Sequence, residues 1–122
     1  MITLQAGQTF EINDSLLADF PWHEFTNVTR FVMEWSAGPF PDIELILKSD
    51  LATNLVACLS LEQVAECRLP TMGIRRLQFS SLTAENVRSL QWEQVNYRIF
   101  DADFEEPVLM FKSGQIQILA AL

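Results

Sequence analysis

The sequence is short of the residues from which catalytic and metal sites are most often built. It contains one histidine, two cysteines and four glycines. A zinc site needs three or four His or Cys ligands at short spacing, and His23, Cys58 and Cys67 do not supply them. A nucleophilic Cys58 would have only the His23 imidazole as its base. No glycine-rich phosphate loop and no catalytic serine elbow occurs. We therefore predict no enzyme activity, no cofactor and no metal site.

Basic residues are also scarce, with 8 Lys and Arg against 16 Asp and Glu and a net charge of −8. A protein that binds nucleic acid needs a basic surface opposite the phosphates, so this composition argues against nucleic-acid binding. The same charge argues against docking on anionic lipid. No apolar run approaches the roughly 20 residues that span a bilayer. The acidic balance suits a basic protein partner, or serves solubility alone.

The two cysteines are fewer than a disulfide-stabilised secreted domain usually has. The N-terminal residues lack the basic and apolar regions of a secretory signal. We therefore expect a cytoplasmic protein in which Cys58 and Cys67 are buried, reduced thiols.

What the chain does have is apolar material, with 49% hydrophobic residues and nine phenylalanines. A chain of 122 residues is long enough to bury about two-thirds of its unfolded surface. We predict a single domain that spans residues 1–122.

The last third of the chain carries the clearest strand patterns. Residues Val95 to Ile99 alternate between apolar and polar, which is typical of a half-buried strand. An acidic turn follows from Asp101 to Pro107, and Val108 to Phe111 is a run of strand formers. We interpret Lys112 to Gly114 as a hairpin loop, with the glycine at a positive φ. The return strand runs from Ile116 to Ile118.

The first half predicts a hairpin and a short helical segment. Strands over Asn27 to Trp35 and Asp42 to Lys48 are joined by a loop rich in Gly and Pro. A short strand at Thr9 to Ile12 precedes Asn13 to Ser15, whose side-chain oxygens suit a helix N-cap. Pro21 ends the segment, so we expect one or two helical turns.

The middle of the chain is less clear. Leu55 to Leu61 is an apolar strand, whereas both a helix and a strand fit Ser60 to Leu69. We favour the strand because the neighbouring segments are strands. We also predict a strand at Ile74 to Phe79, a polar connector at Ser80 to Asn86, and a short strand at Val87 to Trp92.

These segments amount to about eight to ten short strands with frequent turn signals, which indicates an all-β fold. The predicted architecture is an antiparallel β-sandwich or a partly open barrel with one or two short helical turns. No amphipathic helix recurs between the strands, which disfavours a parallel α/β sheet. The residues that we expect to face the core are Phe31, Met33, Trp35, Ile43, Leu45, Leu47, Leu55, Leu59, Tyr97, Ile99, Phe111, Ile116 and Ile118.

Four carboxylates form the densest charge cluster, and they are our candidate partner-binding residues: Asp101, Asp103, Glu105 and Glu106. An acidic patch of this kind suits a basic protein partner. Two other interpretations stay open. The turn is solvated and protects a sheet edge from pairing, or its oxygens hold a hard cation, although the glycine and the ligand order of a calcium loop are missing.

Between about Asn54 and Ile118, apolar segments follow in the order Leu55–Leu59, Ile74–Phe79, Trp92, Tyr97–Asp101 and Phe111–Ile118, and Asp42–Leu47 precedes them. This order resembles that of small bacterial all-β proteins grouped as immunity-protein-like families, in particular the immunity protein 50 type. The resemblance implies a cytoplasmic protein that neutralises a toxin by binding it. It assigns no interface residue to this chain.

We therefore predict a non-catalytic protein-binding module, specifically a bacterial immunity protein whose acidic surface meets a basic toxin. Two alternatives stay open. One is a structural or homo-oligomeric protein of unknown role, and the other is a β-barrel that binds a small molecule in its mouth.

Overall fold

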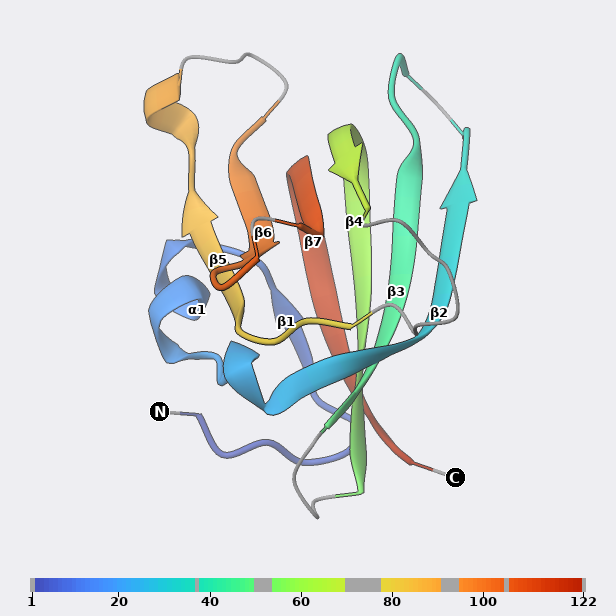
Figure 1. Cartoon of the computed structure of the whole chain (residues 1–122). Coiled ribbons are helices and arrows are strands. Elements are labelled where there is room, and N and C mark those ends of the chain that lie inside the picture. The colour runs from blue at the N-terminus through green and yellow to red at the C-terminus, as the bar shows by residue number, and fades with distance from the viewer. Residues whose placement is uncertain are drawn as a thin grey trace.

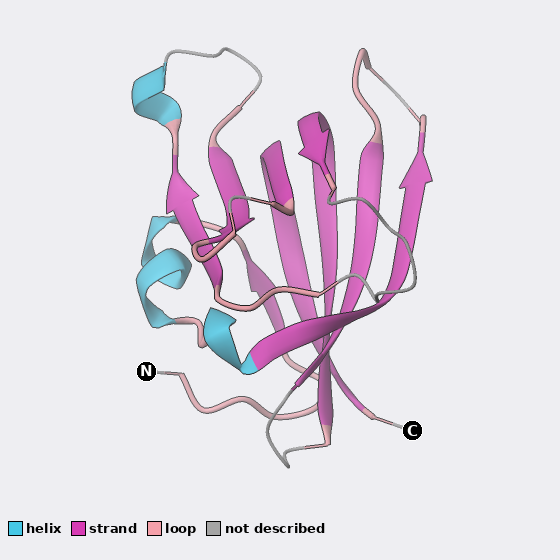
Figure 2. Ribbon diagram, viewed as in Figure 1, coloured by secondary structure: helices cyan, strands magenta, loops and turns pink. Residues whose placement is uncertain are grey.

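A computed structural model describes residues 2–36, 38–49, 54–69, 78–90, 95–104 and 106–121. Within these residues the strands are β1 (Thr9–Glu11), β2 (Phe25–Glu34), β3 (Asp42–Ser49), β4 (Leu55–Arg68), β5 (Leu82–Asn86), β6 (Tyr97–Asp101) and β7 (Val108–Ala120). All seven belong to one sheet in the order β2-β3-β4-β7-β6-β5, with β1 paired to β7 (Figures 1 and 2). Every pairing is antiparallel. The all-β prediction is confirmed.

Strand β7 lies at the centre of this sheet. One edge pairs with β4 along the whole strand, from Val108 to Ala120. The other edge pairs first with β6 and then with β1. The predicted hairpin loop at Lys112 to Gly114 is wrong, because β4 is long enough to pair with both halves of one continuous strand.

The turn signal at Lys112 to Gly114 instead marks a change of phase within β7. Leu109 and Phe111 pack in the main core, and so do Ile116 and Ile118. Strict alternation cannot place both pairs on one face, so the pattern shifts between them. Gly114 is buried. Glycine is required at this position because a Cβ atom would lie too close to the Ser60 carbonyl oxygen, and not because the backbone has a positive φ.

Strand β4 has a matching irregularity, and it explains why Ser60 to Leu69 was ambiguous. The segment lies in β4, as we favoured. A β-bulge separates Val64 from Glu66, and Gln63 has φ of 53°. Because Gln63 has this positive φ, the alternation is interrupted there, and Leu61 and Val64 both face the core although they are three residues apart. This interruption between Leu61 and Val64, which precedes the bulge, produced the helix-like spacing.

The sheet curls toward itself without closing. Asn27 near the start of β2 forms an isolated bridge with Gln78, and the Phe79 amide donates to the Thr26 carbonyl at 2.7 Å. These contacts connect one end of the strand order to the segment that leads into β5. The architecture is therefore a partly open barrel. Of the predicted strand at Ile74 to Phe79, only Gln78 and Phe79 lie within the described residues.

The expected helical turns are confirmed as α1 (Asp14–Asp19) and the 3-10 turn η1 (Trp22–Glu24). The Asn13 side chain accepts from the Leu16 amide at 3.0 Å and so caps α1. Two predictions further along are wrong. The expected connector at 80–86 contains β5. Of the expected strand at 87–92, residues 87–90 contain the 3-10 turn η2 (Arg88–Leu90), and residues 91–92 lie outside the described residues. The alternation in β5 is weak because only Leu82 is a large apolar residue. No helix among the described residues has the length and apolar character needed to cross a bilayer.

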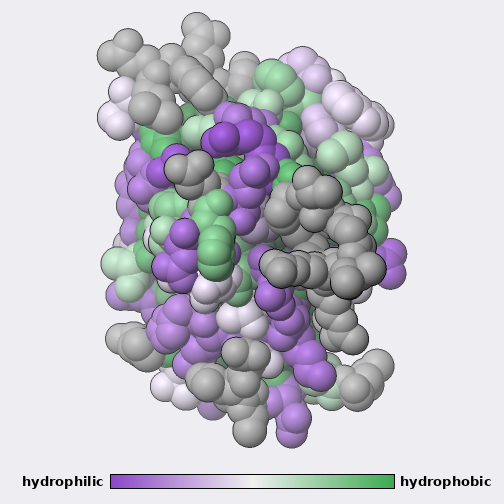
Figure 3. Space-filling view, viewed as in Figure 1, coloured by the Kyte–Doolittle hydropathy of each residue, from purple (hydrophilic) through white to green (hydrophobic). Residues whose placement is uncertain are grey.

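The concave side of the sheet, here called the inner face, holds the main core. Figure 3 shows the molecule from the side of Figure 1, with side chains filling the space between the ribbons. Nine of the predicted core residues are buried: Ile43, Leu45, Leu47, Leu59, Tyr97, Ile99, Phe111, Ile116 and Ile118. Phe31 and Leu55 are partly buried. The prediction is wrong for Met33 and Trp35, which are 44% and 70% exposed, because they lie at the end of the outermost strand.

Candidate functional site

The acidic turn does not present four carboxylates to solvent. Asp101 is only 2% exposed, and its carboxylate accepts from the amides of Ser80 at 2.7 Å and Asp103 at 2.9 Å. Asp103 is exposed and accepts from the Ser80 hydroxyl. Glu106 is partly buried, and Glu105 lies outside the described residues. Asp101 therefore organises the turn and is not available to a partner.

The interpretation of this turn as protection for a sheet edge does not fit the strand order. The turn joins β6 to β7, and both are interior strands of the sheet. Such protection covers the unpaired N–H and C=O groups of an edge strand, and two interior strands do not present such an edge.

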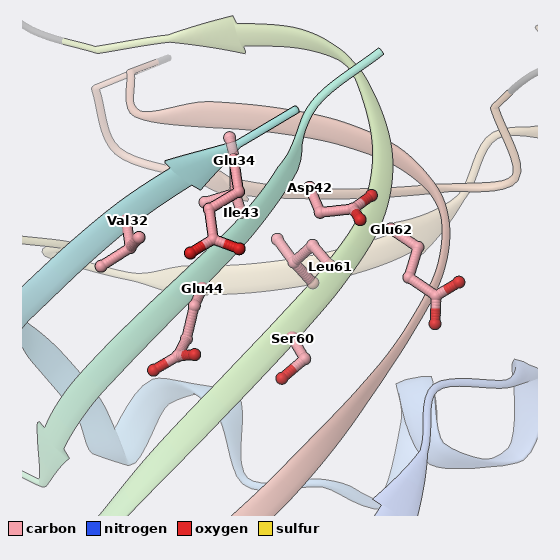
Figure 4. A pocket seen from close by; sticks show the side chains of 8 residues that line it. All are labelled: Val32, Glu34, Asp42, Ile43, Glu44, Ser60, Leu61 and Glu62. Carbon is pink, nitrogen blue, oxygen red and sulfur yellow. The ribbon is translucent and has the colours of Figure 1, made fainter. Parts of the chain in front are cut away.

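A second group of carboxylates lies on the convex side of the sheet, here called the outer face. Four of them, Glu34, Asp42, Glu44 and Glu62, surround a hollow of about 240 Å³. We call it the acidic hollow. Its other lining residues are Val32, Ile43, Ser60 and Leu61 (Figure 4). None of these eight residues is basic, so nothing in the lining neutralises the carboxylates.

Strand register brings these residues together. Glu34 pairs with Asp42 across β2 and β3, and Glu44 pairs with both Val32 and Ser60 on its two sides. Because side chains alternate between faces, every second residue of β2 and β3 contributes to the outer face. The alternation of Ile43, Leu45 and Leu47 in the sequence directs Asp42 and Glu44 outward but does not connect them to Glu34 or Glu62. The only available signal was the alternation, and it does not reveal which strands are neighbours.

The bulge in β4 shapes one end of the acidic hollow. The Gln63 amide donates to Asp42 Oδ1 at 3.0 Å, and the Ser36 hydroxyl donates to Asp42 Oδ2 at 2.7 Å. Hydrogen bonds to a charged carboxylate favour its ionised form. The pKa of Asp42 is therefore lowered, first by the Gln63 amide and then by the Ser36 hydroxyl. This carboxylate stays negative at neutral pH.

The end of β2, the outermost strand, also carries exposed apolar side chains. Met33 and Trp35 flank Glu34 in the sequence, and they are two of the three large apolar residues exposed within the described part of the chain. Met33 pairs with Ile43, so alternation directs it to the face of the strand opposite Glu34. The third, Phe104, lies in the turn between β6 and β7. We call Met33, Trp35 and the acidic hollow together the β2-end surface.

The charges of this surface can attract a cationic group. Carboxylates held together by a sheet repel one another, and a cationic group placed among them relieves that repulsion. No set of three or more His, Cys, Asp or Glu side chains in the described part of the chain has the arrangement of a metal site. His23 is exposed on η1. Burial, followed by the charge of Glu44, raises the pKa of the Cys58 thiol, which disfavours a nucleophilic thiolate.

The fold and this surface describe a small antiparallel β protein with an acidic hollow and a nearby exposed tryptophan. Comparison with protein-family models, curated proteins and solved structures found no match. The resemblance to immunity proteins of the immunity protein 50 type therefore stays a prediction.

Proposed function

We propose that this chain is a non-catalytic binding module and that its β2-end surface docks a basic partner protein. The observation that supports this most directly is the exposure of Trp35, at 70%, and Met33, at 44%, at the end of the strand that supplies Glu34 to the acidic hollow. Tryptophan and methionine are enriched at protein interfaces, and tryptophan is among the residues that most often dominate binding energy.

The charge of the surface defines the partner. The acidic hollow attracts Lys and Arg side chains, and its effect falls mainly on the association rate. The whole chain, at −8, attracts a basic protein from a distance as well. The complementary surface would therefore carry basic residues opposite the acidic hollow and a separate apolar pocket that receives Trp35.

The resemblance to immunity proteins supports a toxin as this partner. A cytoplasmic immunity protein would then neutralise the toxin by covering a basic surface on it. Among the alternatives, self-association through this surface would bring together two acidic hollows, which repel. A ligand in the barrel interior would have to displace core side chains such as Leu45 and Leu59, which are 0–1% exposed.

A binding measurement with two matched variants tests the proposal. The partner to use is the protein encoded beside this gene, with affinity measured by titration calorimetry. We expect Trp35→Ala to weaken binding by about 30-fold, the effect of a typical hot-spot residue. Phe104→Ala is the control, because Phe104 is 71% exposed but lies at the β6–β7 turn.

The outcomes separate clearly. Loss of affinity in Trp35→Ala alone, together with relief of toxicity when the wild-type chain is co-expressed, supports the proposal. Equal affinities for the wild type and both variants would place the interface elsewhere. A loss confined to Phe104→Ala would transfer the interface to the β6–β7 turn.

A further inference from the structure

A second hollow lies on the outer face where β4, β7 and β6 are neighbours. It has a volume of about 420 Å³ and is lined by Arg68, Arg98, Phe100, Asp101, Ala102 and Val108. We call it the arginine hollow. The two arginines come from different strands on either side of β7, in a chain that has only 8 Lys and Arg in total.

Strand register explains why both guanidinium groups meet here. Val108 of β7 pairs with Arg68 of β4 on one side and with Phe100 of β6 on the other. Arg98 lies two residues before Phe100 and therefore on the same face. Its guanidinium carbon is 4.3 Å from the centre of the Phe100 ring. Val108 and Phe100 belong to a small apolar cluster separate from the main core, so the hollow has an apolar floor.

The lining of the arginine hollow carries two guanidinium groups and one carboxylate. Arg68 forms an ion pair with Glu66 through its Nε atom, and Arg98 forms one with Glu85. Neither glutamate is among the lining residues. The single carboxylate of the lining belongs to Asp101, which already accepts hydrogen bonds from two backbone amides. Two guanidinium groups therefore face a hollow in which the only carboxylate is engaged.

The hydrogen bonding of Arg98 is also incomplete. Its Nε atom is buried and has no hydrogen-bond acceptor among the described residues. A buried donor without a partner costs about 1–3 kcal/mol. Glu85, which accepts from one terminal nitrogen, and the Phe100 ring hold the guanidinium in place, so its remaining donors keep a fixed direction.

We infer that the arginine hollow binds an organic carboxylate with an apolar body. The carboxylate accepts hydrogen bonds from Arg68 and Arg98, and the apolar body lies on Val108 and Phe100. A planar carboxylate matches the guanidinium fork in bidentate geometry. An inorganic oxyanion makes no use of the apolar floor and binds more weakly. This site is independent of the β2-end surface.

Benzoate is a suitable probe, and amide NMR shifts of the intact chain are a suitable measurement. We expect benzoate to bind with a dissociation constant of about 1 mM and to shift the amides of Phe100, Ala102 and Val108. Arg68→Gln should weaken binding by about tenfold. Its side chain is 53% exposed, so this variant should remain folded. Arg98→Lys keeps the charge, loses the fork and should weaken binding to a similar degree.

Arg30→Gln is the control because Arg30 lies on β2, outside the lining of this hollow. It should bind benzoate as the wild type does. Acetate and inorganic phosphate, tested alongside, should bind more weakly than benzoate. Phosphate binding tighter than benzoate would contradict the inference. So would unchanged binding in Arg68→Gln, or benzoate shifts spread over the whole surface.

Discussion

Gly114 occupies the point of closest approach between β7 and β4. A Cβ atom at this position would lie 2.8 Å from the Ser60 carbonyl oxygen and 3.1 Å from Ile12 Cδ1. Because a backbone oxygen cannot move aside as a side chain does, the strands would have to separate. We expect Gly114→Ala to lower the free energy of unfolding by about 1–3 kcal/mol.

Chemical denaturation measures this effect, and Gln115→Ala provides the control. Gln115 is the next residue of β7 and is exposed. Gln115→Ala should therefore change the free energy of unfolding by less than about 0.5 kcal/mol. Equal stabilities of Gly114→Ala and the wild type would show that the two strands are less closely packed than described.

Asp101 shows how an acidic residue can be structural in a sequence that suggests a binding patch. Each of its carboxylate oxygens accepts from one backbone amide. Asparagine has only one acceptor oxygen, so in Asp101→Asn an NH2 group would face an amide donor. We expect this change to cost about 1–3 kcal/mol of stability.

Asp103→Asn is the matched change in the same turn. Asp103 is exposed and accepts from the Ser80 hydroxyl, which can rotate to suit an amide oxygen. The thermal midpoint of the Asp103→Asn variant should stay within about one or two degrees of the wild type. A larger loss in Asp103→Asn than in Asp101→Asn would reverse the roles assigned to the two residues.

At the scale of single elements, β3 was predictable almost completely. Its alternation places Leu45 at the centre of the inner face, 1% exposed, between Phe31 of β2 and Leu59 of β4. We expect Leu45→Ala to cost roughly 2–5 kcal/mol, through lost transfer energy and the cavity left behind. Ile46→Ala, on the outer and partly exposed face, should cost clearly less. A denaturant midpoint unchanged in Leu45→Ala would mean that the wrong face had been assigned to the core.

Strands β4 and β7 were predictable only in part. Apolar alternation located both halves of each strand. In the middle of each strand the alternation is interrupted, and this interruption resembled a helix in β4 and a hairpin loop in β7. Bulges are set by pairing with a neighbouring strand, and a single sequence does not reveal that neighbour.

The continuity of β4 decides the state of the two cysteines. Cys58 and Cys67 are both unbonded, and nine residues of extended strand separate them by roughly 30 Å. Bridged cysteines need Cα atoms about 4.4–6.8 Å apart. The expectation that both thiols are buried is wrong, because both are only partly buried. Partial burial still raises the pKa of both thiols, so little thiolate forms at neutral pH.

Thiol titration tests this prediction directly. Protein unfolded without reductant should show two reactive thiols, and the folded protein at neutral pH should react at least about tenfold more slowly. Finding no free thiol in the unfolded protein would overturn both the description of β4 and the expectation of a reducing compartment.

At the scale of the whole molecule, the order and register of the strands decide which residues meet. The acidic hollow takes its carboxylates from three strands, and the arginine hollow takes its guanidinium groups from two. Sequence reasoning could rank acidic residues only by their distance along the chain. It therefore selected the turn from Asp101 to Glu106 and missed a cluster that exists only across strands.

We propose that the acidic hollow, and not the β6–β7 turn, attracts the partner. Two double variants test it with the same change in net charge: Glu34→Gln with Glu44→Gln in the acidic hollow, and Asp103→Asn with Glu106→Gln in the turn. The measurement is the association rate with the basic partner at low and high salt. We expect only the first variant to associate more slowly and with a flatter salt dependence, because charges at an interface rim act mainly on association. Wild-type kinetics for the first variant, with slower association for the second, would contradict the account.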